Sequence, residues 1–303
     1  MRRYIRYAMM CVAVSCLYSD ALRSTAAAAR EGELTNIMLA PAKIRFYELR
    51  LREKGYDPAN LESIKAAAAD PKWASARWNA IGLLGARMGK EAMPMFRQAL
   101  DDPHQTVRCY AATLLGISGD KGGLVRMRRD LADLTPVKSV AAIDEATDLN
   151  DRQKRDAKRQ RILQLDDALA AAEVLAELGD HSGYDLALKV VKGDGHPGQR
   201  DRAVAILYYI SRTDLAVLRA ENLDPDGVLL ALAQTEQAPS VIAVIHRYAN
   251  VYRRPEVGIR IMETLAKSPH VTEKQRADIE RSLKYRKQDL EKPRQPDPTQ
   301  KKK

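Results

Sequence analysis

The side chains that could bind a charged partner recur in segments with the apolar periodicity of amphipathic helices. We predict as binding residues the basic side chains Arg97, Arg128, Arg129 and Lys189. Basic residues lined along one helical surface can form an electropositive groove for an acidic peptide, a phosphate-bearing chain or a glycan. The alternative is a solvated helix face that is neutralised by the nearby Asp130, Asp133 and Asp185, and the sequence leaves that alternative open.

Residue patterns that would perform catalysis are weak. The histidines form no HExxH pair with metal-ligand spacing: His104, His181, His196, His246 and His270. The run from Gly193 to Gly198 matches GxGxxG literally, but it follows an amphipathic helical stretch, whereas the dinucleotide fingerprint needs a preceding strand. We therefore expect no catalytic residues, no metal, no cofactor and no enzymatic activity.

The first 29 residues have the layout of an export signal. A basic start (MRRYIRY) precedes an apolar run and then small residues (STAAAA). Cleavage could fall in the alanine run, or Cys16 could be lipidated as in a lipoprotein. We expect export to the periplasm or cell envelope, with membrane contact only through that lipid anchor. The alternatives are a mitochondrial presequence or an uncleaved helix on a cytoplasmic protein.

The positive charge is confined to three segments. The net charge is +10, but basic residues concentrate in the leader, in residues 150–161 with six basic and two acidic residues, and in residues 284–303 with eight and three. A solenoid that binds nucleic acid would more typically be basic along its helices. We therefore expect nucleic-acid binding to be absent, while polyanion binding through the basic linker and tail stays an alternative.

Composition and self-similarity define the fold class. Ala and Leu dominate the apolar residues, and aromatic residues are only 5%, which favours helix over sheet. The 31 residues from Asp70 align with the 31 from Asp101, and AATLLGISGDKGG from Ala111 aligns with AAEVLAELGDHSG from Ala171. Each unit reads as an Asp-Pro turn, an Ala-rich helix, a Gly turn and a second amphipathic helix. One hairpin cannot bury its apolar face alone, so we predict an all-α solenoid of stacked antiparallel helical hairpins.

The stretch DDPHQTVRCYAATLLGISGD resembles the HEAT repeat, particularly the short bacterial type found in phycobilisome lyase-like proteins. The resemblance is strongest over 70–131 and weakest over 193–290. It implies a ladder between repeats made by the Arg of the first helix and the Asp of the preceding turn. Arg77, Arg108, Asp70 and Asp102 match those positions.

The predicted organisation follows from these patterns. Residues 30–60 form an N-terminal capping region, 61–286 the HEAT-like solenoid with a charged insertion at about 135–162, and 287–303 a disordered basic tail. The charged segment is either an exposed insertion or an extension of the next helix. Trp73 and Trp78 are five residues apart on one helix and cannot face the same core. We expect one of them either to pack under the helix at 41–54 or to be partly exposed, where it could anchor an interface.

The function that follows is a non-enzymatic scaffold or protein-binding module, monomeric, with an unidentified protein partner. A lyase or lyase accessory that resembles the phycobilisome lyases is the alternative, and such a protein would handle a tetrapyrrole on an acceptor protein.

Overall fold

The computed structural model describes residues 41–135, 137 and 140–291. The chain divides into two compact units, one ending at Asp194 and one beginning at Gly195. All regular secondary structure in the described residues is helical, which confirms the all-α class of HEAT-like helical hairpins. None of the described helices is both long and apolar enough to cross a bilayer. The predicted leader at 1–29, with Cys16, lies outside the described residues.

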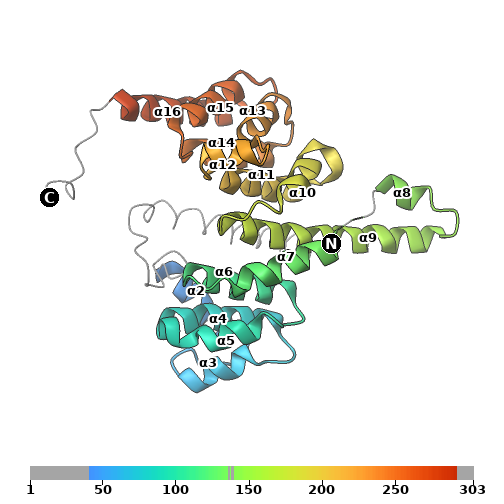
Figure 1. Ribbon diagram of the computed structural model, residues 1–303, viewed down its shortest axis with the longest axis vertical. Coiled ribbons are helices and arrows are strands. Elements are labelled where there is room, and N and C mark those ends of the chain that lie inside the picture. The colour runs from blue at the N-terminus through green and yellow to red at the C-terminus, as the bar shows by residue number, and fades with distance from the viewer. Residues whose placement is uncertain (1–40, 136, 138–139, 292–303) are drawn as a thin grey trace, which may run out of the picture. The chain divides into compact units, whose positions relative to one another are not determined.

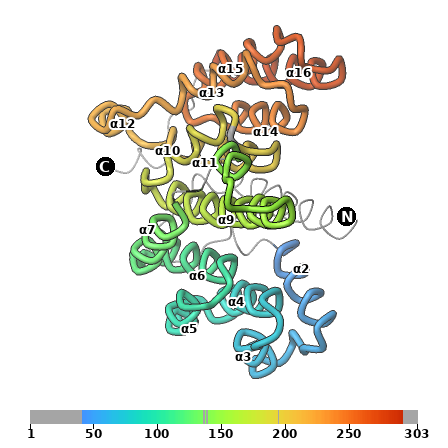
Figure 2. Tube along the Cα trace, turned by 90° about the vertical axis from the view of Figure 1, so that its right-hand side faces the viewer, coloured from blue at the N-terminus to red at the C-terminus, as the bar shows by residue number. Residues whose placement is uncertain are grey.

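Unit 1 is built from two layers of helices (Figures 1 and 2). The first-helix layer contains α4 (Ala74–Met88), α6 (Gln105–Ile117) and α9 (Asp151–Glu177). The second-helix layer contains α3 (Leu61–Ala68), α5 (Met93–Ala99), α7 (Gly122–Leu134) and α10 (Tyr184–Lys189). Further elements are α2 (Pro41–Arg52), α8 (Val140–Asp144), a 3-10 turn η1 (Gly89–Ala92) and a π-helical turn η2 (Val190–Asp194).

Small residues allow the two helices of a hairpin to approach closely. A Cβ added to Gly123 on α7 would lie 2.7 Å from the Cα of Ala112 on α6, and one added to Gly183 would lie 2.6 Å from the Cβ of Ala172 on α9. The second pair lies 60 residues after the first, which is the offset at which the sequence from Ala111 aligns with the sequence from Ala171. The close packing that we predicted from the Ala residues of the first helix therefore also requires a Gly at the start of the second helix.

The turn between the two helices also repeats. Gly119 and Gly179 adopt φ values of +82° and +84°, a conformation that glycine tolerates and other residues rarely adopt. The aspartate that follows each glycine then accepts a hydrogen bond from a backbone N–H two residues later, Gly122 for Asp120 and Ser182 for Asp180. Each Gly-Asp pair thus ends one helix and starts the next.

Helix α2 covers one end of the first-helix layer. Tyr47 is buried, and its ring lies so close to Gly82 on α4 that a Cβ there would be 2.7 Å from the ring. The ring of Trp78 stacks on Phe46 of α2 with 6.1 Å between centroids. Trp73 is 41% exposed, and Lys54 Nζ lies 3.8 Å from its ring centroid. The expectation that one tryptophan lies under this helix is confirmed for Trp78.

The charged insertion is largely helical. Asn150 caps α9 through a reciprocal contact with Gln153, and the helix then continues without a break through the basic run into the buried Leu165. The second half of the predicted insertion at 135–162 is thus the first part of a repeat helix, which agrees with the helix extension that the sequence allowed.

Unit 2 has the same two-layer arrangement. One layer contains α11 (Pro197–Ser211), α14 (Pro239–Asn250) and α16 (Glu273–Glu291), and the other α13 (Pro225–Thr235) and α15 (Pro255–Lys267), with the short α12 (Leu215–Ala220) between α11 and α13. The predicted tail began at 287, whereas α16 extends to Glu291. Residues 292–303 of that tail lie outside the described residues.

Candidate binding surface

Arginines near the start of the first helices join one repeat to the next. Arg77 Nε donates to Asp102 Oδ2 at 2.6 Å, and its second terminal nitrogen donates to Asp102 Oδ1 at 2.8 Å. The remaining terminal nitrogen donates to the carbonyl oxygen of Asp70 at 2.8 Å. Both charged side chains are about nine-tenths buried. Burial alone raises the pKa of Asp102, but hydrogen bonds from Arg77 and from the His104 N–H outweigh it, and the pKa lies below its ordinary value.

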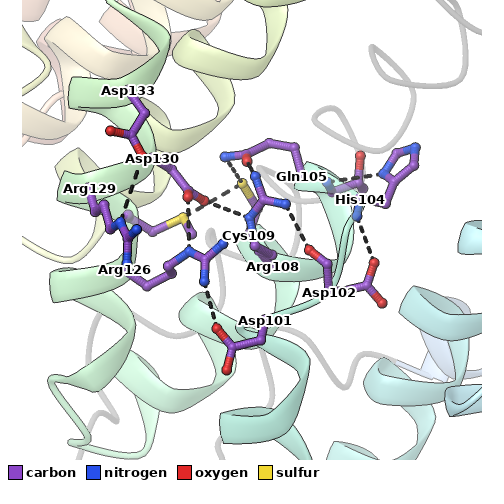
Figure 3. Close-up of polar contacts among 12 residues, drawn as sticks. Asp101, Asp102, His104, Gln105, Arg108, Cys109, Arg126, Arg129, Asp130 and Asp133 are labelled. Atoms are coloured by element: carbon purple, nitrogen blue, oxygen red, sulfur yellow. Dashed lines mark hydrogen bonds and ion pairs between the residues drawn. The ribbon is translucent and has the colours of Figure 1, made fainter.

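The neighbouring arginine departs from this pairing for a structural reason (Figure 3). Arg108 donates to the carbonyl oxygen of Asp102 at 2.8 Å, as Arg77 does to that of Asp70. Its carboxylate partner, however, is Asp130 on α7 at 2.7 Å, and Asp130 also accepts from Arg126 at 2.9 Å. The next first helix, α9, follows the insertion and has no Asp-Pro turn before it, so Arg108 pairs with a carboxylate from its own hairpin.

The same arrangement occurs in unit 2, where the sequence repeat is weakest. Arg200 on α11 donates to the carbonyl oxygen of Gly195 at 3.2 Å and to Glu236 Oε1 at 3.0 Å. Glu236 lies in the turn before α14, where it accepts from the N–H of Ala238 at 2.8 Å. Arg276 on α16 donates to the carbonyl oxygen of Ser268 at 3.1 Å. We call Arg77, Arg108, Arg200 and Arg276 the first-helix arginines.

Two predicted binding residues form a second set of contacts between repeats. Arg97 Nε on α5 donates to Asp120 Oδ2 at 2.9 Å, and Arg128 Nε on α7 donates to Asp180 Oδ2 at 2.5 Å. Both aspartates belong to the Gly-Asp turn after the next first helix. Hydrogen bonds from the Gly122 N–H and from Arg97 lower the pKa of Asp120. These second-helix arginines, Arg97 and Arg128, therefore act as inter-repeat contacts.

The other two predicted residues are more open to an outside partner. Arg129 has a side chain that is 77% exposed, and its nearest carboxylate is that of Asp133 at 3.7 Å, one turn along α7. Val125 lies one turn before Arg129 and is 67% exposed. Lys189 is exposed at the end of α10. The structure thus separates the four predicted residues into two inter-repeat contacts and two surface cations, and whether they bind a partner stays a prediction.

A pocket opens between α7, α9 and α10. Its volume is about 270 Å³, and it is lined by Leu131, Thr135, Val137, Arg161, Leu165, Ser182, Asp185, Leu186, Lys189 and Val190. Leu165 and Val190 are buried beneath it, as is the Arg161 side chain, whereas Ser182, Asp185 and Lys189 are exposed around it. The sequence analysis found Lys189 but missed the pocket, because the lining comes from positions that do not recur between repeats.

The histidines have structural roles where their contacts are defined. His104 and His196 cap α6 and α11 by accepting from the N–H of Thr106 and Gln199. His246 Nε2 lies 3.0 Å from Ser282 Oγ, a nucleophile–base distance, but Ser282 lies inside α16, where backbone N–H groups bond within the helix and offer no oxyanion site. In the part of the chain that the structure describes, no group of His, Cys, Asp and Glu side chains could hold a metal ion.

Comparison with known proteins gives a distant structural likeness. No protein-family model matches the chain, and no curated protein matches its sequence. A chain of the complex of CpcE and CpcF of phycocyanin lyase from Nostoc sp. PCC7120 is 14% identical with a TM-score of 0.37, and the match covers 81% of this chain and 89% of that chain.

That neighbour corrects one expectation. The sequence predicted a protein without enzymatic activity, whereas a solved structure that this chain resembles is that of a lyase complex. The non-enzymatic prediction is therefore wrong.

Proposed function

We propose that the protein is a helical-repeat module that binds a protein partner through the second-helix layer of unit 1. The single observation that supports this function is the pocket of about 270 Å³ between α7 and α10. The exposed Val125 and Arg129 lie on α7, one of the helices that line it. Exposed apolar and arginine side chains such as these two are typical of the anchor regions of protein interfaces, although neither of them lines the pocket itself.

A matched pair of variants tests this function. Val125→Glu combined with Arg129→Glu changes two exposed side chains of α7, so the fold should be retained while partner binding falls at least tenfold. Arg45→Glu combined with Leu49→Glu makes the same change of charge on the exposed face of α2, where Leu49 is 52% exposed, and should leave binding unchanged. The measurement is recovery of the partner under native conditions, followed by an affinity titration with that partner. Equal binding by both variants would contradict the proposed surface.

A second candidate function is a lyase or lyase accessory, supported by the HEAT pattern of residues 101–120 and its resemblance to phycobilisome lyase-like proteins. This candidate predicts that a tetrapyrrole chromophore co-purifies with the protein and that it transfers to an acceptor such as phycocyanin. Absorbance and fluorescence of the acceptor after incubation would measure that transfer, and an unmodified acceptor would count against it.

We also propose that the protein is exported, on the basis of the leader pattern at 1–29. Mass spectrometry of the mature N-terminus tests this proposal. A new N-terminus within the alanine run indicates secretion, and a lipidated Cys16 indicates a lipoprotein. An intact Met1 on cytosolic protein would overturn the proposal.

A further inference from the structure

The pocket between α7, α9 and α10 has a size that limits its occupant. Pockets for drug-sized ligands and cofactors typically occupy about 300–1,000 Å³, so a volume of about 270 Å³ lies just below that range. One branched side chain or a comparably small molecule fits this space, whereas a large cofactor does not. Both a free small molecule and the end of a peptide satisfy this limit.

The lining combines aliphatic walls and one buried cation with a rim that carries one cation and one carboxylate. Leu165 is 2% exposed and Val190 is 1% exposed, and Leu131 and Leu186 complete the apolar wall. The charged lining residues are two cations, Arg161 and Lys189, and one carboxylate, Asp185. Such a lining favours a ligand with an aliphatic body and one negative charge, since the body displaces water from apolar walls while the charge stays near the cations.

Lys189 is a lining side chain that can donate to a carboxylate oxygen. The hydroxyls of Ser182 and Thr135 also line the pocket, but they donate to the Asp180 carboxylate and to the Leu131 carbonyl oxygen. Arg161 is 8% exposed, so its positive charge lies beneath the pocket opening.

We propose that this pocket binds the carboxylate of a small aliphatic acid of about leucine size, either as a free molecule or as the C-terminal residue of a protein chain. The second form rests on the proposed protein-binding function and deepens it, because it names the part of the partner that enters the pocket. The first form does not depend on that function.

The test compares an acid with its neutral isostere. The full-length protein, with labelled Leu and Val methyl groups, is titrated with 4-methylpentanoate and separately with 4-methylpentanamide, at matched ionic strength. We expect the methyl signals of Leu165, Leu186 and Val190 to shift and saturate with the acid, and the amide to bind about tenfold more weakly or worse, since a hydrogen bond to a charged group contributes that much. Inorganic phosphate, which lacks the aliphatic body, should bind more weakly than the acid.

Two lysine variants test whether the positive charge that binds the acid is that of the pocket. Lys189→Met should weaken binding of the acid about tenfold, whereas Lys192→Met, on an exposed lysine of the adjoining η2 turn, should leave it unchanged. Equal binding of acid and amide, equal binding of phosphate and acid, or shifts that do not saturate with any probe would each overturn the proposal.

A hexapeptide that ends in leucine distinguishes the two sources. Tighter binding of the free-acid peptide than of 4-methylpentanoate, with loss of binding on C-terminal amidation, indicates a chain terminus, and equal binding indicates a small acid. If the pocket binds none of these probes while Val125→Glu with Arg129→Glu still abolishes partner binding, this inference fails and the proposed function stands. If the pocket binds the acid but those substitutions leave partner binding unchanged, the proposed function fails and the inference stands.

Discussion

At the scale of single residues, two arginines that make similar contacts should contribute differently to the stability of the fold. Arg77 and Arg97 both bridge adjacent repeats, but the Arg77 side chain is 10% exposed and that of Arg97 is 59% exposed. Removing one partner of a buried ion pair leaves the other charge without compensation, whereas an exposed pair contributes little because water and salt screen it.

Replacing the two arginines separately measures this difference. Arg77→Ala should lower the free energy of unfolding by about 3–5 kcal/mol, and Arg97→Ala by about 1 kcal/mol or less. Arg77→Lys should recover little of the loss, because lysine cannot make the two parallel contacts to Asp102. Chemical denaturation of the three variants gives the comparison. Similar losses for Arg77→Ala and Arg97→Ala would show that burial does not determine the contribution.

Lys43 on α2 predicts an unusual dependence of stability on pH. It is 5% exposed, and its burial lowers its pKa from 10.5 to about 8, although Glu177 acts in the opposite direction. Below about pH 8 the lysine is protonated in both the folded and the unfolded chain, and the buried charge is unfavourable. Between about pH 8 and 10.5 the folded protein releases the proton first, so its contribution to stability rises with pH.

Lys43→Met should therefore stabilise the protein at pH 7 by about 1–3 kcal/mol and remove the gain between pH 8 and 10. Lys65→Met is the control, since Lys65 makes only an exposed pair with Glu62, and its effect should stay within about 0.5 kcal/mol. Urea denaturation at pH 7 and 9.5 measures both. A destabilising effect of Lys43→Met at both pH values would contradict the assigned cost of burial.

At the scale of elements, a hairpin depends on how closely its helices approach. Gly123→Ala should cost about 1–3 kcal/mol, because the new methyl group would meet the backbone of α6 and force the helices apart. Gly122→Ala is a matched control one residue away. Its Cβ would meet only the flexible Asp120 carboxylate at 3.1 Å, and the change in the free energy of unfolding should be within about 0.5 kcal/mol. Equal costs for the two substitutions would contradict the close-approach explanation.

The elements also show how far sequence reasoning reaches. The pairing of Arg77 with Asp102 could be predicted because residues 70–131 repeat without interruption. The pairing of Arg128 with Asp180 could not, since the insertion before α9 separates them by 52 residues whereas Arg97 and Asp120 are 23 apart. In unit 2 Glu236 takes the position of the turn aspartate. Arg200 therefore makes the same kind of contact with a glutamate that Arg77 makes with an aspartate.

At the scale of the whole molecule, the second-helix arginines and two of the four first-helix arginines, Arg77 and Arg200, form contacts between repeats. What remains for recognition is irregular: the exposed face of α7 and the pocket beside α10, both in unit 1. The periodicity of a single helix could not predict the pocket, because residues from three separate helices line it. The first-helix arginines place the same type of contact in both units, although the sequence repeat is clear only in unit 1.

Hydrogen–deuterium exchange of the full-length protein, with and without its recovered protein partner, tests the central claim most directly. We expect partner binding to increase protection in α7, in α10 and in the part of α9 that lines the pocket, while α2, α4 and α6 exchange as before. Protection confined to α2 and α4, or to unit 2, would contradict it.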